Sequence, residues 1–264
     1  MILNKFPGIK ALILDMDGVL WRDTQAIGDL PAIFDKIKCL NLKLLLATNN
    51  ATRSIDEHML KLNGFGVNID ESQAINSAQA VAVYLSRQFP QKGNVYVVGE
   101  PGLKSTLSDN GFIHNENCTP DTALAVIASL DYSFTYEKLK KATLLVRSGL
   151  PLIGTNPDTT YPTPQGQTPG SGTIIKAIET SSEVQAVIIG KPQPLLYSIA
   201  LDKLGTEPQE TLAVGDRLET DIAGAQAAGC LTALVLSGVS TLEQAKQWYP
   251  QPDVICQDLE ELIQ

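Results

Sequence analysis

The chain has 264 residues, a length that accommodates one or two domains with a sizeable buried core. It carries 29 acidic and 20 basic side chains, a formal net charge of -9, which disfavours nucleic acids and anionic membrane surfaces as partners. With 44% hydrophobic and 19% charged residues it is not a disordered chain, and no apolar run reaches the roughly 18 residues of a membrane-spanning helix.

Short runs rich in Val, Ile, Leu and Ala predict strands that are buried on both faces, because they do not alternate with polar residues. In chain order these runs are Lys10–Leu14, Lys43–Ala47, Asn94–Val98, Leu124–Ser129, Pro151–Gly154, Val184–Ile189, Thr211–Val214 and Leu231–Leu236. Helical patterns separate them at Leu30–Leu40, Ser54–Leu62, Ser77–Gln88, Tyr136–Ser148, Leu195–Leu204 and Thr220–Ala228. This alternation predicts an α/β fold with a parallel sheet. The segment Asn156–Gly172, dense in Pro, Gly and Thr, predicts a long structured loop or a connection between domains.

The four cysteines show no CxxC and no Cys/His metal spacing, so we expect reduced thiols. The first residues lack a small-residue cleavage site and reach an acidic cluster by Asp15, so no signal peptide is predicted. Both observations favour a cytoplasmic protein.

Polar side chains directly follow four of the predicted strands. They are Asp15, Asp17 and Gly18 after ALIL, Thr48, Asn49 and Asn50 after KLLLA, Lys191 after AVIIG, and Asp216 and Asp221 after TLAVG. Ligands of open parallel sheets bind at the carboxyl ends of the strands, so we expect these side chains to converge on one crevice.

Each of these residue types has a chemical use in such a crevice. Converging carboxylates repel each other unless a cation lies between them, and a few oxygen ligands suit Mg²⁺. A carboxylate beside the ion can attack phosphorus, and a second carboxylate two residues away can transfer protons. A lysine and a threonine hydroxyl can stabilise the charge of a transferring phosphoryl group. Gly18 allows a sharp turn between these groups.

These segments resemble the motifs of a known superfamily. ALILDMDGVLW is similar to motif I (DxDG) of the haloacid dehalogenase superfamily, KLLLATNN to motif II, GKP to motif III and GDRLETD to motif IV. The stretches TNPD, PGSG and LSGVS further resemble the 4-nitrophenylphosphatase-like branch. The resemblance covers essentially the whole chain. It implies a Rossmann-like, doubly wound parallel-sheet core with an inserted α/β cap domain, Mg²⁺, and hydrolysis of phosphate monoesters.

The resemblance also implies roles for individual residues. Asp15 corresponds to the nucleophile and a metal ligand, and Asp17 to the general acid/base, which also binds the metal through its backbone carbonyl. Lys191 neutralises the nucleophile and the phosphate. Asp216 is the third protein ligand of the metal, and Asp221 supports the site without contacting the ion.

Other residues are assigned to substrate binding. By the same resemblance, Thr48 is expected to be a catalytic residue that, with Asn49, holds the phosphoryl group, and Gly18 and Asn50 are expected in the same phosphate-binding set. Tyr161 stands where relatives carry a residue that touches the organic part of the substrate; a packed loop tyrosine is the alternative interpretation.

The spacing of the motifs predicts the domain organisation. Residues 1–80 and 181–264 are expected to form a discontinuous catalytic core, and residues 81–180 an inserted cap that excludes water and contacts the substrate. Relatives often pair through the cap, so a homodimer formed through it is one expectation.

The leading hypothesis is a Mg²⁺-dependent phosphatase for a small phosphorylated metabolite. Two alternatives remain open at this stage. A mutase or phosphotransferase would pass the phosphoryl group to a sugar instead of water, and a phospho-accepting signalling module would keep it for longer on the aspartate. The sequence does not identify the ester that serves as substrate.

Overall fold

The computed structural model describes residues 2–163 and 166–264, and for residues 161–163 only the course of the backbone. The chain divides into two compact units. The first comprises the residues up to Thr48, Ile55–Ile75 and Lys191–Gln264, and the second comprises Asn49–Ser54 and Asn76–Gly190. The insert expected at 81–180 lies inside the second unit. The chain first leaves the first unit after Thr48, passes through it again over Ile55–Ile75, and returns to it finally at Lys191.

A six-stranded sheet forms the centre of the first unit, with the strand order β15-β14-β13-β1-β4-β5. Its strands are β1 (Ala11–Leu14), β4 (Lys43–Thr48), β5 (Ala74–Asn76), β13 (Thr211–Gly215), β14 (Leu231–Val235) and β15 (Val254–Cys256). β1 pairs in parallel with both β4 and β13, and β13, β14 and β15 continue in parallel. The chain therefore builds outward from β1 on one side and then on the other, which confirms the doubly wound core. The strand order reverses between β1 and β13, the position at which such sheets bind ligands.

Helices cover this sheet. They are α1 (Ile2–Lys5), α2 (Leu30–Cys39), α3 (Ile55–Gly64), α8 (Leu195–Leu204), α9 (Ala223–Ala227), α10 (Leu242–Gln247) and α11 (Leu259–Ile263). Alternate strand residues such as Leu12, Leu14 and Leu46 lie in one apolar cluster, while α8 packs on β4 and α9 on β14. All residues of β1 and β13 are buried, which explains why both strands have continuous apolar runs in the sequence.

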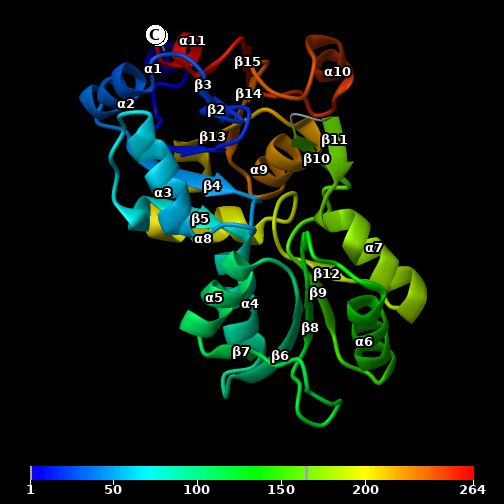
Figure 1. Cartoon of the computed structure of the whole chain (residues 1–264). Helices are drawn as coiled ribbons and strands as arrows, with labels where there is room; N and C mark the ends of the chain where they lie inside the picture. Colours follow the sequence, from blue (N-terminus) through cyan, green and yellow to red (C-terminus); the bar gives the residue numbers. More distant parts are fainter. Residues whose placement is uncertain (1, 164–165) are drawn as a thin grey trace. The chain divides into compact units, whose positions relative to one another are not determined.

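The second unit contains a five-stranded sheet with the order β12-β9-β8-β6-β7, and its neighbouring strands also pair in parallel. The strands are β6 (Gly93–Val98), β7 (Phe112–His114), β8 (Val126–Ala128), β9 (Leu152–Gly154) and β12 (Val187–Ile188). Helices α4 (Ser77–Gln88) and α5 (Pro101–Asp109) lie on one face, and α6 (Tyr136–Arg147) and α7 (Ser171–Ser182) lie on the other (Figure 1).

Three predicted segments differ from the structure. The loop expected at Asn156–Gly172 contains an antiparallel hairpin of β10 (Thr160–Thr163) and β11 (Gly166–Pro169). The strand expected at Val184–Ile189 is limited to β12, because α7 runs to Ser182 and Glu183 then takes a left-handed conformation with φ 63°. The helix expected at Thr220–Ala228 begins as a π-helix over Leu218–Ile222.

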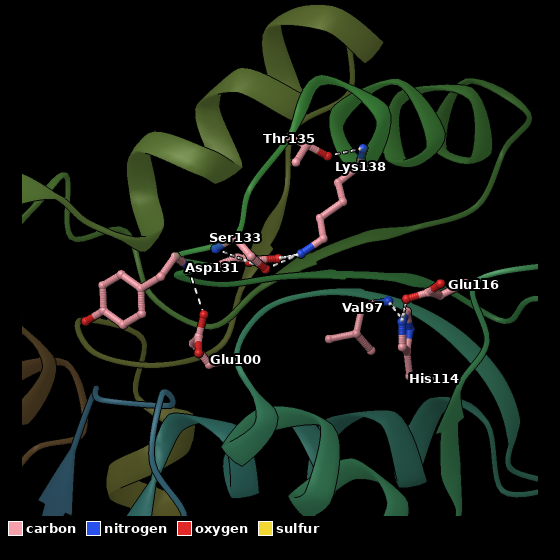
Figure 2. Close-up of polar contacts among 9 residues, drawn as sticks. Val97, Glu100, His114, Glu116, Asp131, Ser133, Thr135 and Lys138 are labelled. Atoms are coloured by element: carbon pink, nitrogen blue, oxygen red, sulfur yellow. Dashed lines mark hydrogen bonds and ion pairs between the residues drawn. The ribbon is translucent and has the colours of Figure 1, made fainter.

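The loop from β8 to α6 is held by a buried acid. Oδ1 of Asp131 accepts hydrogen bonds from the backbone N–H and the hydroxyl of Ser133, at 2.9 and 2.8 Å. Its Oδ2 accepts from Lys138 Nζ at 2.7 Å, and Thr135 caps α6 beside this pair (Figure 2). The hydrogen bonds hold the pKa of Asp131 below its ordinary value, although burial alone would raise it.

Among the residues that the structure describes, no helix has the length and apolar character needed to cross a membrane.

Candidate active site

Asp15 and Asp216 lie at the two strand ends that flank the reversal of strand order. Asp15 directly follows β1, and its backbone N–H donates to Val214 O of β13 at 2.9 Å. Asp216 directly follows β13. Because β1 and β13 run in parallel with Leu14 opposite Val214, both carboxylates emerge at the same edge of the sheet.

Lys191 joins Asp15 to a second carboxylate. Its ammonium donates to Asp15 Oδ1 at 2.7 Å and to Asp221 Oδ1 at 2.7 Å, and the residue is only 1% exposed. Carboxylate oxygens of Asp15, Asp216 and Asp221 all lie within 4.8 Å of one another. The structure thus brings together four of the residues that the sequence selected, and all four belong to the first unit.

Asp221 is held in place from several directions. Its Oδ2 accepts the backbone N–H of Arg217 at 3.0 Å, and its carbonyl accepts the Tyr197 hydroxyl at 2.9 Å. It lies within the π-helix that follows β13; such wide helical turns are frequent at functional sites. Both carboxylate oxygens therefore have donors inside the protein, as a residue that orients Lys191 requires.

The Asp216 carboxylate fits its position because Gly18 and Gly238 next to it have no side chains. A Cβ on Gly18 would lie 2.5 Å from Asp216 Oδ2, and one on Gly238 would overlap the same carboxylate. Gly18 also has φ +86°, a conformation that other residues rarely adopt. The backbone N–H of Val239 donates to Asp216 Oδ2 at 2.8 Å. Backbone from two separate loops thus surrounds one carboxylate.

The electrostatics of the cluster suit a divalent cation. Burial raises the pKa of Asp216 to about 7, and the neighbouring charge of Asp221 adds to this rise. Burial also raises the pKa of Asp15 well above its ordinary value, although Lys191 opposes the shift. Burial alone would lower the pKa of Lys191, but Asp15 and Asp221 outweigh it and raise that pKa. Three ionised carboxylates and one ammonium leave a formal charge of about −2, and the oxygen-only donors fit a hard divalent ion.

Asp17 lies on the turn that follows Asp15 and is partly exposed. Its Oδ1 accepts a hydrogen bond from the indole N–H of Trp21 at 2.8 Å. The two residues also form an isolated backbone bridge at the base of the hairpin of β2 (Trp21–Arg22) and β3 (Gln25–Ala26).

The remaining predicted residues have different surroundings. Thr48 ends β4 and is buried in the first unit. Asn49 belongs to the second unit, where its carbonyl accepts from Ser77 Oγ and Asn156 Nδ2 at 2.6 and 2.9 Å. Asn50 also belongs to the second unit, and its Oδ1 accepts from the N–H and hydroxyl of Thr52. Tyr161 lies in β10, but its side chain falls outside the described residues, so its role stays a prediction.

The sequence did not predict the contact between Asp216 and the loop that follows β14. The stretch LSGVS follows β14, and its Gly238 and Val239 make the close approaches to Asp216. The signal was present, because this stretch also stands at the carboxyl end of a parallel strand. LSGVS contributed only to the resemblance to the branch, because its contacts with Asp216 come from backbone atoms, which residue types do not reveal.

Fold and site together define an α/β enzyme with a carboxylate–lysine centre at the switch point of its sheet. The haloacid dehalogenase-like hydrolase family model matches residues 12–113, and a related hydrolase model of that family matches residues 188–262. The chain belongs to the haloacid dehalogenase-like hydrolase family.

Individual relatives resemble the chain over nearly its full length. An acid sugar phosphatase of Staphylococcus epidermidis is 35% identical over 250 residues, covering 95% of each chain. The crystal structure of a 4-nitrophenylphosphatase from Thermotoga maritima matches with a TM-score of 0.91 and 30% identity, covering 98% of each chain. A p-nitrophenyl phosphatase from Archaeoglobus fulgidus matches with a TM-score of 0.89 and 30% identity, covering 97% of this chain and 98% of the other. These matches agree with the family and the branch that the motifs indicated.

Proposed function

We propose that the protein is a Mg²⁺-dependent phosphatase that hydrolyses small phosphate monoesters through an aspartyl-phosphate on Asp15. The observation that carries the proposal is the buried cluster of Asp15, Asp216 and Asp221 with Lys191 at the switch point of the sheet. The relatives, an acid sugar phosphatase and two nitrophenyl phosphatases, support phosphate monoesters as the substrate class.

The chain's own residues account for both chemical steps. In the first, a carboxylate oxygen of Asp15 attacks phosphorus, the bond from phosphorus to the ester oxygen breaks, and the departing oxygen takes the proton of the Asp17 carboxyl. In the second, the Asp17 carboxylate accepts a proton from water as that water attacks the phosphoryl group. The bond from phosphorus to Asp15 then breaks, inorganic phosphate leaves, and both side chains are restored.

Lys191 has two tasks in this proposal. Its 2.7 Å contact with Asp15 Oδ1 orients the nucleophile so that the other carboxylate oxygen is available for attack. Its positive charge stabilises the negative charge of the phosphoryl group during transfer. Asp221 holds the ammonium in position from the opposite side, at 2.7 Å.

Mg²⁺ would be held by the carboxylates of Asp15 and Asp216 and by the backbone carbonyl of Asp17. When bound, such an ion neutralises charge on the phosphoryl oxygens. The compact oxygen-only cluster and the carboxylate pKa values raised by burial support a cation at this position.

The second unit is proposed to select the organic part of the substrate. The support is its position in the chain, because it begins directly after Thr48 and ends directly before Lys191. The first and the last of the connections between the units therefore adjoin residues that we assign to the phosphoryl group.

Removal of the divalent ion should stop phosphate release. We expect no turnover of 4-nitrophenyl phosphate or of a sugar phosphate in excess chelator, and full recovery when Mg²⁺ is added back. Ca²⁺ should bind without supporting turnover, because its larger and more variable coordination shell misplaces the nucleophile. Inorganic phosphate is measured directly in each case. Undiminished release in chelator would refute the metal requirement.

Gly238→Ala should weaken Mg²⁺ binding. The added methyl group would occupy the space of the Asp216 carboxylate, so that side chain must move away from its present position. We expect Mg²⁺ affinity to fall about 10- to 100-fold, as for losses around other metal ligands, when measured by calorimetric titration. Gly8→Ala is the matched control, because nothing lies within 4 Å of a Cβ at Gly8. Equal Mg²⁺ affinity in the two variants would contradict the assignment of Asp216.

A further inference from the structure

The side chain of Trp21 is fully buried in the apolar core of the first unit. It is 0% exposed, and its ring lies 5.9 Å from that of Phe65 at an interplanar angle of 30°. The ammonium of Lys61 lies 4.2 Å from the ring centroid on an adjacent helix. The indole therefore has little freedom to rotate, and its N–H direction is set by packing.

The backbone ties this ring to the turn that carries Asp17. The Gly18 N–H donates to Trp21 O at 2.7 Å, and the Trp21 N–H donates to Met16 O at 3.4 Å. Asp17 and Trp21 pair as a backbone bridge. The turn and the ring are thus parts of one rigid arrangement, and the hydrogen bond from Trp21 Nε1 to Asp17 Oδ1 at 2.8 Å closes it through the side chains.

We propose that Trp21 is a positioning residue for Asp17, and that its indole N–H determines which carboxylate oxygen of Asp17 transfers the proton. This inference rests on the proposed function. An indole N–H can donate a hydrogen bond but cannot accept one. Asp17 Oδ1 is therefore the acceptor. The carbonyl oxygen of a carboxyl group accepts more strongly than its hydroxyl oxygen, so this hydrogen bond favours the proton of the Asp17 carboxyl on Oδ2. Trp21 holds Oδ1 and leaves Oδ2 to face the ester oxygen in the first step and water in the second.

Loss of this hydrogen bond should affect the two classes of ester differently. A poor leaving group, such as the alkoxide of glycerol phosphate, needs the proton of Asp17 when the ester bond breaks. A good leaving group such as 4-nitrophenolate departs without it, but the later attack of water on the aspartyl-phosphate still needs Asp17. The loss of the hydrogen bond therefore slows turnover only when a step that needs proton transfer by Asp17 limits the rate.

The test compares wild type with Trp21→Phe, which keeps an aromatic ring in the core and removes the N–H. For glycerol phosphate we expect kcat/KM to fall about 10- to 100-fold, a part of the effect of a general acid. For 4-nitrophenyl phosphate, kcat and KM should fall together and kcat/KM should change less than about threefold, because hydrolysis of the intermediate becomes limiting. A merely structural defect would lower kcat/KM for both esters by the same factor.

Two further variants sharpen the comparison. Trp248→Phe makes the same chemical change at the chain's other tryptophan, whose indole N–H donates to Gln226 Oε1 at 3.4 Å, and it should leave both esters unaffected. In an Asp17→Asn background the additional effect of Trp21→Phe should disappear, since residues that act as a unit are not additive.

The outcomes separate this inference from the proposed function. If wild type releases phosphate, Asp15→Asn does not, and Trp21→Phe affects both esters equally or neither, the positioning role is wrong and the proposed function stands. If wild type releases no phosphate from any ester with Mg²⁺, the proposed function itself fails. Should Trp21→Phe not fold, replacement of Trp21 by 3-benzothienylalanine removes the N–H at nearly unchanged volume, and the same divergence between esters is then required.

Discussion

Asp15→Asn should abolish the release of inorganic phosphate from every ester tested, with a loss of about 10⁴-fold or more in kcat. The amide cannot attack phosphorus as a carboxylate does, and no other residue of the carboxylate–lysine cluster directly follows β1 in the chain. The measurement is phosphate release with saturating Mg²⁺, together with detection of phosphorylated protein after rapid acid quenching. Wild type should show the aspartyl-phosphate, and the variant should show none.

The matched control for this variant is Asp23→Asn. Asp23 is exposed, lies eight residues further along the chain in the β2–β3 turn, and has φ 48°, a conformation that asparagine also tolerates. The same chemical change there should leave kcat within about twofold of wild type, as surface substitutions away from functional groups usually are nearly neutral. Wild-type turnover by Asp15→Asn would mean that the nucleophile lies elsewhere.

Lys191→Met should greatly destabilise the protein when no divalent ion is present. The methionine fills much of the same space but leaves the buried carboxylates of Asp15 and Asp221 without their shared cation. Removal of one partner from a buried ion pair costs about 3–5 kcal/mol, so we expect a decrease of this size in the free energy of unfolding at pH 8. Urea unfolding in chelator measures it.

Acid should partly restore the stability of Lys191→Met. Burial raises the pKa of Asp15 well above its ordinary value and that of Asp216 to about 7, whereas an unfolded aspartate titrates near 4. Between about pH 4 and pH 7 the folded state therefore holds protons that the unfolded state has lost, and stability falls as the pH rises through this window. In wild type Lys191 lowers both pKa values, so its loss should raise them further and the folded variant should bind protons that folded wild type does not. The deficit of the variant should therefore be smaller at pH 5.5 than at pH 8.

Lys10→Met provides the comparison at the surface of the same unit. Lys10 pairs with Glu210 at 2.5 Å, but its side chain is 62% exposed. An exposed pair contributes less than about 1 kcal/mol, so this variant should unfold close to wild type at both pH values. If Lys191→Met were no less stable than Lys10→Met in chelator at pH 8, the carboxylates would have another source of compensation.

Several features of the site were predictable from sequence for one reason: they follow buried parallel strands. Asp15 and Asp216 each directly follow a strand that is buried throughout, and parallel pairing places such ends at one edge of a sheet. Lys191 was predicted by its motif, although β12 before it is only two residues long and belongs to the second unit. Here the strand-end argument was weak, and the resemblance to a known family supplied the assignment.

Short elements were harder to predict. β5, β7 and β15 each have three residues, too few for a hydrophobic period to stand out from neighbouring loops. The β10–β11 hairpin lies in a segment rich in Pro, Gly and Thr, where turn-forming residues obscure the pattern of strands. These elements form because neighbouring strands offer hydrogen-bonding partners. A single sequence does not show which strands will be neighbours in the sheet.

The sequence by itself determined the class of fold, the residues of the carboxylate–lysine centre and the family. Buried strands, and the motifs that directly follow them in the chain, are local patterns. Only the tertiary structure decided how those residues are held. The enclosure of Asp216 by Gly18 and Gly238, the bond from Tyr197 to the Asp221 carbonyl and the bond from Trp21 to Asp17 depend on side-chain packing or on backbone from distant segments. Such contacts depend on the positions of packed atoms to within a few tenths of an ångström, which residue types and their spacing do not specify.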